Sequence, residues 1–393
     1  MAIQDRLSGN EAVSIAIKQI NPDVMPAFPI TPSTEIPQFI SQFIANGEMD
    51  TVFVPVESEH SAMSACIGSQ SAGGRTVTAT SSCGLALMFE MLYVAASNRL
   101  PITMAVVNRA LSGPININND HSDSMGARDS GWLQIYAENA QEAYDNFFQC
   151  MKIGEHPAVQ LPVMCCQDGF ITSHAVERME LIETEKVKAF MGEYKPEHYL
   201  LNPDQTLAVG PYDIPQYYME HKKAQAVAME NARAAILEVA KEFEAMTGRK
   251  YGMIEEYCME DAELAMIIIG SSAGTAKEAC DELRAAGIKA GVIKVRVFRP
   301  FPAEEIVAAL KGVKAVAIMD KTESFSANGG PMGAEVKAAM FGKLGDVLVT
   351  NYIYGIGGRD VKVDDLKSVY DKLAEMVKTG KSPEHYQYLA LRD

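Results

Sequence analysis

The stretch VFVPVESEHSAMSACIGSQSAGGRTVTATSSCG, residues 52–84, shows how this chain is organised. An apolar run at 52–56 precedes a helix-length segment at 59–72, and after a Gly-Gly turn a second apolar run follows at 76–80. Strands that alternate with helices predict a parallel sheet covered on both faces. Because ligands bind at the carboxyl ends of the strands in such sheets, we expect functional side chains in the loops that follow them.

The same alternation continues on both sides of this stretch, up to about residue 170. Strands are expected at 24–28 and 102–107, and helices at 33–46 and 85–96. Another helix is expected to begin around Asn10, whose side chain is of the type that caps helix N-termini. Right-handed crossovers then predict one doubly wound domain.

The pattern changes between about residues 175 and 260, where prolines interrupt the chain before a charged helix from about 216 to 247. We interpret this part as an arm that packs over the first domain or reaches a partner chain. The alternation then resumes, with strands expected at 264–269, 290–297, 315–319 and 347–350, and helices at 275–286 and 303–310. The sequence therefore predicts two doubly wound α/β domains, residues 1–260 including the arm and residues 261–376, followed by a tail at 377–393.

Composition excludes several classes of protein. The 393 residues are 48% apolar and carry a formal net charge of −16, which disfavours nucleic acid as a partner. No apolar run approaches the ~20 residues needed to span a bilayer, and no signal-peptide pattern is present. We therefore expect a cytoplasmic protein without a membrane partner.

The seven cysteines are scattered and form no C-x-x-C pair. A disulfide framework, a zinc site and an iron–sulfur cluster on this chain are therefore all disfavoured. We expect no metal ligands here.

Three chemically distinct side chains follow predicted strands. Thr31 lies after the strand at 24–28, Glu59 after the strand at 52–56, and Arg109 after the strand at 102–107. Strand order alone would bring a hydroxyl, a carboxylate and a guanidinium to one rim of the sheet. Each has a structural alternative when taken singly: a helix cap for Thr31, a favourable helix dipole for Glu59, and a surface ion pair for Arg109.

Two readings from other classes compete. Residues 270–274, GSSAG, match the G-x-S-x-G pattern of serine hydrolases and lie between a predicted strand and helix, which would make Ser272 the nucleophile. The only later histidine is His385, in the tail, so a capping turn is favoured instead. A non-catalytic scaffold with two α/β lobes is the other alternative. Neither nucleotide-binding glycine motif is present.

Seven motifs carry a resemblance: FPITP (28–32), VESEH (56–60), TATSSCG (78–84), NRALS (108–112), DHSD (120–123), RDSG (128–131) and IKVRVFRP (293–300). Taken in order across nearly the whole chain, they resemble the α subunit of 2-oxoacid:ferredoxin oxidoreductases, most closely the pyruvate type. The resemblance implies a thiamine-enzyme pyrimidine-type domain followed by a transketolase C-terminal-like domain.

The same resemblance implies residue roles. Glu59 matches the glutamate that hydrogen-bonds N1′ of the thiamine aminopyrimidine, and Thr31 and Arg109 match residues that hold the oxoacid; these three are the implied catalytic residues. Pro29, Ile30 and Ser82, together with Glu59, are the implied contacts to the cofactor.

The resemblance also implies an assembly with β, γ and δ subunits. Since this chain has no Gly-Asp-Gly, thiamine diphosphate would be shared with a partner, and Mg²⁺ and the [4Fe–4S] clusters would lie on partner subunits. The implied reaction is the reversible, CoA-dependent oxidative decarboxylation of pyruvate to acetyl-CoA and CO₂, with ferredoxin as electron acceptor. Phe28 and the pair at 118–119 depart from the family pattern, so a 2-oxoisovalerate-type substrate stays open, whereas Thr31 argues against oxalate.

Overall fold

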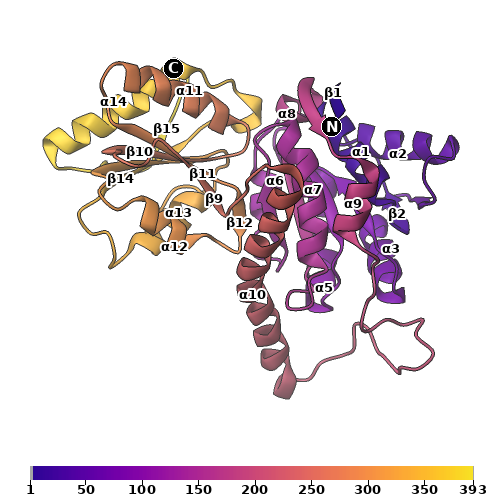
Figure 1. Ribbon diagram of the computed structural model, residues 1–393. Coiled ribbons are helices and arrows are strands. Elements are labelled where there is room, and N and C mark those ends of the chain that lie inside the picture. Colours follow the sequence, from indigo (N-terminus) through magenta and orange to yellow (C-terminus); the bar gives the residue numbers. More distant parts are fainter. Residues whose placement is uncertain (1–2, 393) are drawn as a thin grey trace.

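A five-stranded sheet with the order β12-β6-β7-β5-β4 organises the first part of the chain in the computed structural model, which describes residues 3–392 (Figure 1). A bridge between Val24 and Thr76 extends it to the paired strands β2 and β3. All neighbours pair in parallel except β12, which is antiparallel to β6. The strands are β2 (Val24–Ala27), β3 (Val52–Pro55), β4 (Val77–Thr80), β5 (Thr103–Asn108), β6 (Leu133–Tyr136), β7 (Val163–Asp168) and β12 (Val297–Arg299).

Helices cover this sheet on both faces, as its fully buried strands β4 to β7 require. A separate antiparallel pair, β1 (Ile3–Leu7) and β8 (Glu177–Leu181), lies beside them. The helices are α1 (Gly9–Ile20), α2 (Glu35–Ala45), α3 (Glu59–Ala72), α4 (Ser82–Leu87), α5 (Phe89–Ser97), α6 (Ser122–Gly126), α7 (Ala140–Gly154), α8 (Ile171–His174) and α9 (Thr184–Met191).

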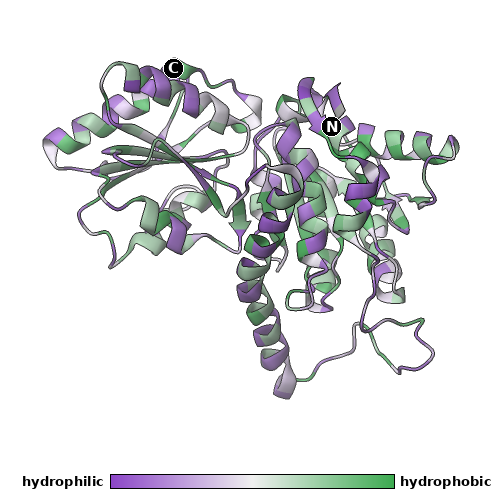
Figure 2. Cartoon of the chain, in the orientation of Figure 1, coloured by the Kyte–Doolittle hydropathy of each residue, from purple (hydrophilic) through white to green (hydrophobic). Residues whose placement is uncertain are grey.

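The second sheet has six strands in the order β15-β14-β13-β10-β11-β9. In Figure 2 its strands are mainly hydrophobic, whereas hydrophilic residues lie on the helices around them. The strands are β9 (Ile254–Tyr257), β10 (Leu264–Ile269), β11 (Ala290–Val295), β13 (Ala315–Asp320), β14 (Leu348–Ile353) and β15 (Gln387–Tyr388). The helices are α11 (Ser272–Ala285), α12 (Ala303–Ala309), α13 (Pro331–Met340), the short 3₁₀ helix η1 (Ile356–Gly358) and α14 (Val363–Thr379).

The second sheet includes strands from outside the predicted limits of the second domain, residues 261–376. Strand β9 precedes that limit but pairs with β11, and β15 lies in the predicted tail but pairs with β14. A single cluster of buried apolar side chains contains both Trp132, just before β6 of the first domain, and Met332, in α13 of the second domain. The domains therefore pack through a continuous hydrophobic core, which disfavours independent motion.

The strand expected at 290–297 is wrong as a single element. It divides at Arg296, after which β12 leaves the second sheet and pairs with β6 of the first. Arg296 is buried and donates from Nε to Asn146 Oδ1 at 2.9 Å and from Nη2 to Gln149 Oε1 at 3.1 Å. A buried guanidinium needs such partners, and they lie on α7 of the first domain.

Two local expectations in the first domain are also wrong. The cap of α1 is Ser8, whose hydroxyl accepts from Glu11 N, while Asn10 is buried and donates to Pro32 O at 2.9 Å. The helix expected at 85–96 is divided into α4 and α5 at Met88, where ψ is 9°. Buried side chains keep a helical spacing across the break, so the apolar pattern does not reveal it.

The part expected to be an arm, about residues 175–260, is only partly one, because β8 and α9 belong to the first domain and β9 to the second sheet. The arm proper consists of an irregular segment, residues 192–214, and the long helix α10 (Pro215–Thr247). Figure 1 shows α10 running alongside the first domain and the irregular segment looping away from it. Tyr194 in that segment accepts from Gln70 Nε2 at 2.6 Å, and a cavity of about 450 Å³ lies between the segment and the first domain. Among residues 3–392, none of the helices combines the length and hydropathy that a membrane span requires.

Candidate functional site

The carboxyl ends of β2, β4 and β5 form one rim, and the sequence-predicted residues lie on it. Thr31 follows β2 in an exposed turn, and Arg109 follows β5 directly. Arg109 is almost completely buried and donates from Nη1 to Thr31 O at 3.0 Å. The fold therefore brings these two residues into contact although 78 positions separate them.

The guanidinium of Arg109 is only partly satisfied by protein. Its Nε donates to Asn116 O at 3.1 Å, and its backbone N–H donates to Asp123 Oδ2 at 2.9 Å. Within residues 3–392, Nη2 has no hydrogen-bond partner. An arginine offers five N–H donors in one plane, so the remaining edge is free to bind a carboxylate.

Glu59 is the first residue of α3 and is only 6% exposed. The helix cap is Ser58, whose hydroxyl accepts from Ser61 N at 3.2 Å, so capping does not explain Glu59. Its carboxylate has no hydrogen bond or ion pair within the described part of the chain. A buried carboxylate without partners is costly unless something else binds it.

Glycine at position 84 makes this placement possible. A Cβ atom there would lie 2.6 Å from Glu59 Oε1 and 2.5 Å from Thr80 Oγ1, closer than real contacts allow. The hydroxyls of Thr80 and Ser81 are buried without a hydrogen-bond partner. Unpartnered polar atoms therefore gather at the end of β4 next to Glu59, which is the pattern expected where a ligand completes the hydrogen bonding.

Ser82 is tied to the neighbouring strand end. Its hydroxyl donates to Ala110 O at 2.5 Å, and its backbone N–H donates to Asp123 Oδ2 at 2.9 Å. Asp123 thus accepts from the loops after both β4 and β5, and from the Asn108 side chain at 2.8 Å. Burial raises the pKa of Asp123 to about 6, and the backbone donors oppose that rise. This carboxylate fixes the relative position of the two loops.

The remaining cofactor candidates lie in the turn after β2. Pro29 is exposed and Ile30 is half-buried, and the Ile30 carbonyl accepts from Ser33 Oγ at 2.8 Å. Cys83, beside Ser82, contacts Ser112 Oγ at 2.9 Å, and this hydrogen bond lowers the pKa of the thiol.

A different group of charges lies at the junction between the domains. Asp168, at the end of β7, accepts from Lys321 Nζ at 2.9 Å, contacts His121 Nε2 at 2.7 Å and accepts from Ser271 Oγ at 2.5 Å. Burial alone would favour the protonated carboxyl, but the charges of Lys321 and His121 lower the pKa of Asp168 well below its usual range. Lys321 and Ser271 belong to the second domain, so this ion pair joins the two domains.

The same junction weakens the hydrolase alternative. Ser271 donates to the carboxylate and not to an imidazole, and Ser272 has no hydrogen bond to a histidine within residues 3–392. His385 is exposed in the tail. The serine of a G-x-S-x-G hydrolase needs an imidazole within hydrogen-bond reach, and within residues 3–392 neither serine has one.

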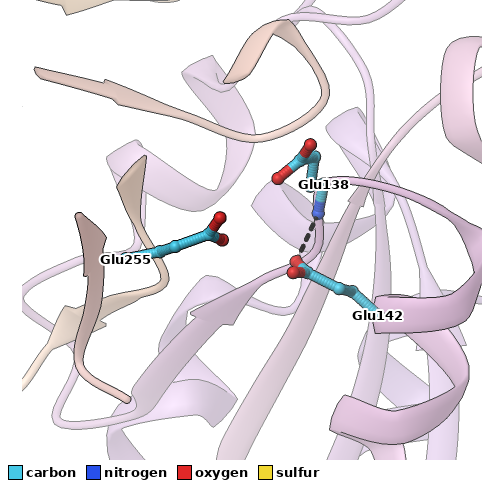
Figure 3. Close-up of side chains that lie close together, drawn as sticks. All are labelled: Glu138, Glu142 and Glu255. Atoms are coloured by element: carbon cyan, nitrogen blue, oxygen red, sulfur yellow. Dashed lines mark hydrogen bonds between the residues drawn. The ribbon is translucent and has the colours of Figure 1, made fainter. Parts of the chain in front are cut away.

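Three carboxylates with metal-ligand spacing also lie at the junction (Figure 3). Lys294 Nζ lies 2.7 Å from Glu138 Oε2 and 2.6 Å from Glu142 Oε1, and it also pairs with Glu255. Burial opposes a charged Lys294, but the three carboxylates raise its pKa. Lys277 Nζ also lies 2.8 Å from Glu138 Oε2 and 2.7 Å from Glu255 Oε1, so two ammonium groups hold the place that a metal cation would take.

Sequence reasoning did not assign the supporting residues of the rim. Asp123 lies in the DHSD motif at 120–123, but the motif assigns it no role, and no sequence pattern marks Asn116. Both act through contacts that only the tertiary structure creates.

Two protein-family models match this chain, one in each of its two parts. A family model described as pyruvate flavodoxin/ferredoxin oxidoreductase, thiamine diphosphate-binding, matches residues 15–241. A second, described as pyruvate:ferredoxin oxidoreductase core domain II, matches residues 262–366.

Curated relatives match over almost the whole chain. Pyruvate synthase subunit PorA of Thermotoga maritima is 48% identical over 98% of each chain. The PorA subunit of Pyrococcus furiosus is 45% identical over 100% of this chain and 99% of its own. Ketoisovalerate oxidoreductase subunit VorA of Pyrococcus furiosus is 45% identical over 96% of each.

Solved structures show the same fold at low identity. The 2-oxoglutarate:ferredoxin oxidoreductase of Magnetococcus marinus gives a TM-score of 0.73 at 18% identity, over 95% of this chain and 65% of that one. A split-gene transketolase gives 0.58 at 13% identity, over 94% of this chain and 99% of that one. The predicted α/β fold class is confirmed.

Proposed function

Since the chain belongs to the pyruvate flavodoxin/ferredoxin oxidoreductase family, we propose that it is the α subunit of a pyruvate synthase. With its partner subunits it catalyses the reversible, CoA-dependent oxidative decarboxylation of pyruvate to acetyl-CoA and CO₂, and ferredoxin takes up the electrons.

The observation that carries this proposal is the partly satisfied guanidinium of Arg109. Its Nε and Nη1 are fixed by the carbonyls of Asn116 and Thr31, which leaves Nη2 for a substrate oxygen. A buried, permanently charged group held in one orientation suits the carboxylate of a small oxoacid. Thr31 lies beside it and offers a hydroxyl to the same substrate.

Glu59 fits the cofactor equally well. Its buried carboxylate has no partner within residues 3–392, and the unpartnered hydroxyls of Thr80 and Ser81 lie on the adjoining strand end. In this proposal Glu59 binds N1′ of the thiamine aminopyrimidine and keeps a proton there. When bound, thiamine diphosphate supplies the nucleophilic carbon for the keto group. Ser82, Pro29 and Ile30 complete the wall on this side.

A partner subunit must supply the rest of the site. This chain has no Gly-Asp-Gly with which to hold Mg²⁺ and the diphosphate, and its cysteines lack cluster spacing. Apolar side chains near the rim are exposed, with Ile115 at 75%, Leu87 at 52% and Ile117 at 45%. Exposed apolar surface of this kind favours a protein partner. We assign the Mg²⁺ site and the [4Fe–4S] clusters to the β, γ and δ subunits, which form the path to ferredoxin.

The oxoacid itself has a second candidate. PorA and VorA of Pyrococcus furiosus are both 45% identical to this chain, so a branched oxoacid such as 2-oxoisovalerate is the alternative to pyruvate. Phe28 and the pair Asn118-Asn119 are the departures from the family pattern that could reshape the pocket.

The test uses the complex purified with its native partner chains. Wild-type enzyme should reduce ferredoxin with pyruvate and CoA, and Arg109→Ala should raise the pyruvate KM about 10- to 100-fold, the worth of a charged hydrogen bond. Arg99→Ala is the control, because Arg99 donates only to backbone carbonyls away from the rim. Unchanged kinetics in Arg109→Ala would contradict the proposal.

A further inference from the structure

A glycine-rich loop of the second domain, residues 355–358, contacts the first domain beside the rim. It follows β14 and contains η1, and Gly357 has a φ of 61°. It faces the segment of residues 116–121, which connects Arg109 to α6. We call these two parts the glycine loop and the facing segment.

Two hydrogen bonds join them. Asn116 Nδ2 donates to Gly357 O at 2.9 Å, and Gly357 N donates to Asp120 Oδ2 at 3.1 Å. The approach is so close that a Cβ atom on Gly357 would lie 2.5 Å from Asn116 Nδ2. Only glycine therefore permits both the backbone conformation and the contact at this position.

The contact continues to the substrate side of the rim. The side chain of Asn116 binds the glycine loop, while its backbone carbonyl accepts from Arg109 Nε at 3.1 Å. Arg109 then donates to Thr31 O at 3.0 Å. A continuous series of hydrogen bonds thus runs from the second domain to Arg109 and Thr31.

We propose that the glycine loop sets the orientation of the Arg109 guanidinium, and that Gly357 and Asn116 are positioning residues for oxoacid binding. This inference rests on the proposed role of Arg109. A guanidinium binds a carboxylate well only when its planar donors are correctly aimed, so the support behind it determines substrate affinity. The second domain is then part of the substrate site without touching the substrate.

The first test is Gly357→Ala in the assembled enzyme. The added methyl displaces Asn116, so the pyruvate KM should rise about tenfold while kcat changes less than about twofold and the KM for CoA stays constant. Gly342→Ala is the matched control, since Gly342 also has a positive φ, 72°, in the same domain but has nothing within 4 Å of a Cβ. It should leave the pyruvate KM unchanged.

A second variant keeps the test decisive if Gly357→Ala fails to assemble. Asn116→Ala removes the donor to the glycine loop and the acceptor of Asn118 N and Nδ2, but it keeps the carbonyl that binds Arg109, and it should also raise the pyruvate KM. Where both variants assemble, the double variant should have a pyruvate KM no higher than that of the more severe single variant, because both changes remove the same contact between Asn116 and Gly357.

The outcomes separate this inference from the proposed function. If Arg109→Ala leaves the pyruvate KM unchanged, the role of Arg109 fails, and the positioning role fails with it. If Arg109→Ala raises the KM but Gly357→Ala and Asn116→Ala do not, only the positioning role is wrong. Equal rises in the KM for pyruvate and for CoA, or independent effects in the double variant, would also overturn it.

Discussion

The rim of the first domain and the junction between the domains both bury charged side chains, but they satisfy them differently. At the junction, Asp168 contacts a lysine, a histidine and a serine, and Lys294 is surrounded by three carboxylates. At the rim, Glu59 and the Nη2 group of Arg109 have no partner within residues 3–392. Charges with complete partners hold the fold together, and we propose that charges without partners bind ligands.

The largest effect that this comparison predicts is catalytic. Glu59→Gln should lower kcat about 10²- to 10⁴-fold, the usual contribution of a positioned acid or base. The free energy of unfolding should not fall, because Glu59 has no partner within residues 3–392 to lose and the variant removes a charge from a buried residue. Chemical denaturation and steady-state assays of the assembled enzyme measure the two effects.

Glu185→Gln is the control for this variant, since Glu185 also lies in the first turn of a helix but pairs with Lys188 at the surface. If Glu59→Gln has the kcat of the wild-type enzyme, the proposal that unpartnered charges at the rim serve catalysis is wrong.

The junction should respond in the opposite way. Asp168→Asn leaves Lys321 buried without its counter-ion, so the free energy of unfolding should fall by about 3–5 kcal/mol. Because the folded pKa of Asp168 is lowered, its contribution is present above pH ~4 and is lost as the pH falls further, so the deficit of the variant should shrink in acid. Denaturant titrations at several pH values measure this, with the exposed Asp371→Asn as control.

The three-glutamate cluster at the junction should also lose stability when the buried ammonium of Lys294 is removed. Lys294→Met leaves three close carboxylates with only Lys277, which lies 2.8 Å from Glu138 Oε2 and 2.7 Å from Glu255 Oε1, and this should cost about 3 kcal/mol. A divalent cation can then enter, so Ca²⁺ should raise the Tm of the variant and leave that of the wild-type chain unchanged. Equal responses of the two proteins to Ca²⁺ would show that Lys294 does not occupy the cation's place.

The smallest predicted effect on stability is that of Asp123. This residue lies at the rim, but like the junction charges it has hydrogen-bond partners. Its folded pKa of about 6 lies above the ordinary value of about 4, so its contribution to stability is full below pH ~4 and is lost as the pH rises through 6. Wild-type protein should lose about 2 kcal/mol relative to Asp123→Asn between pH 4 and pH 7. Parallel unfolding curves across that range would contradict the raised pKa.

Much of the fold follows from periodicity. The strand expected at 264–269 coincides with β10, and the helix expected at 59–72 coincides with α3. Apolar runs of strand length and helices bounded by small or glycine residues are local features, so the sequence reveals them. The divided strand at Arg296 and the pairing of β9 and β15 with the second sheet depend on partners far along the chain, which periodicity does not encode.

The candidate site divides in the same way. Strand order was enough to predict Thr31, Glu59 and Arg109 on one rim, because parallel strands end at the same edge. Three features of the site could not be predicted, because each depends on distances between loops that are remote in sequence. They are the hydrogen bonds that Asp123 accepts from the loops after β4 and β5, the contact from Asn116 to Gly357, and the lack of partners for Glu59.

The amino-acid sequence by itself determined which residue types follow each strand, and hence the chemistry available at the rim. The tertiary structure decided which of those charges are neutralised and which stay open to a ligand. The physical reason is that the free energy of a buried charge depends on its partners within a few ångströms, and folding selects those partners from both domains.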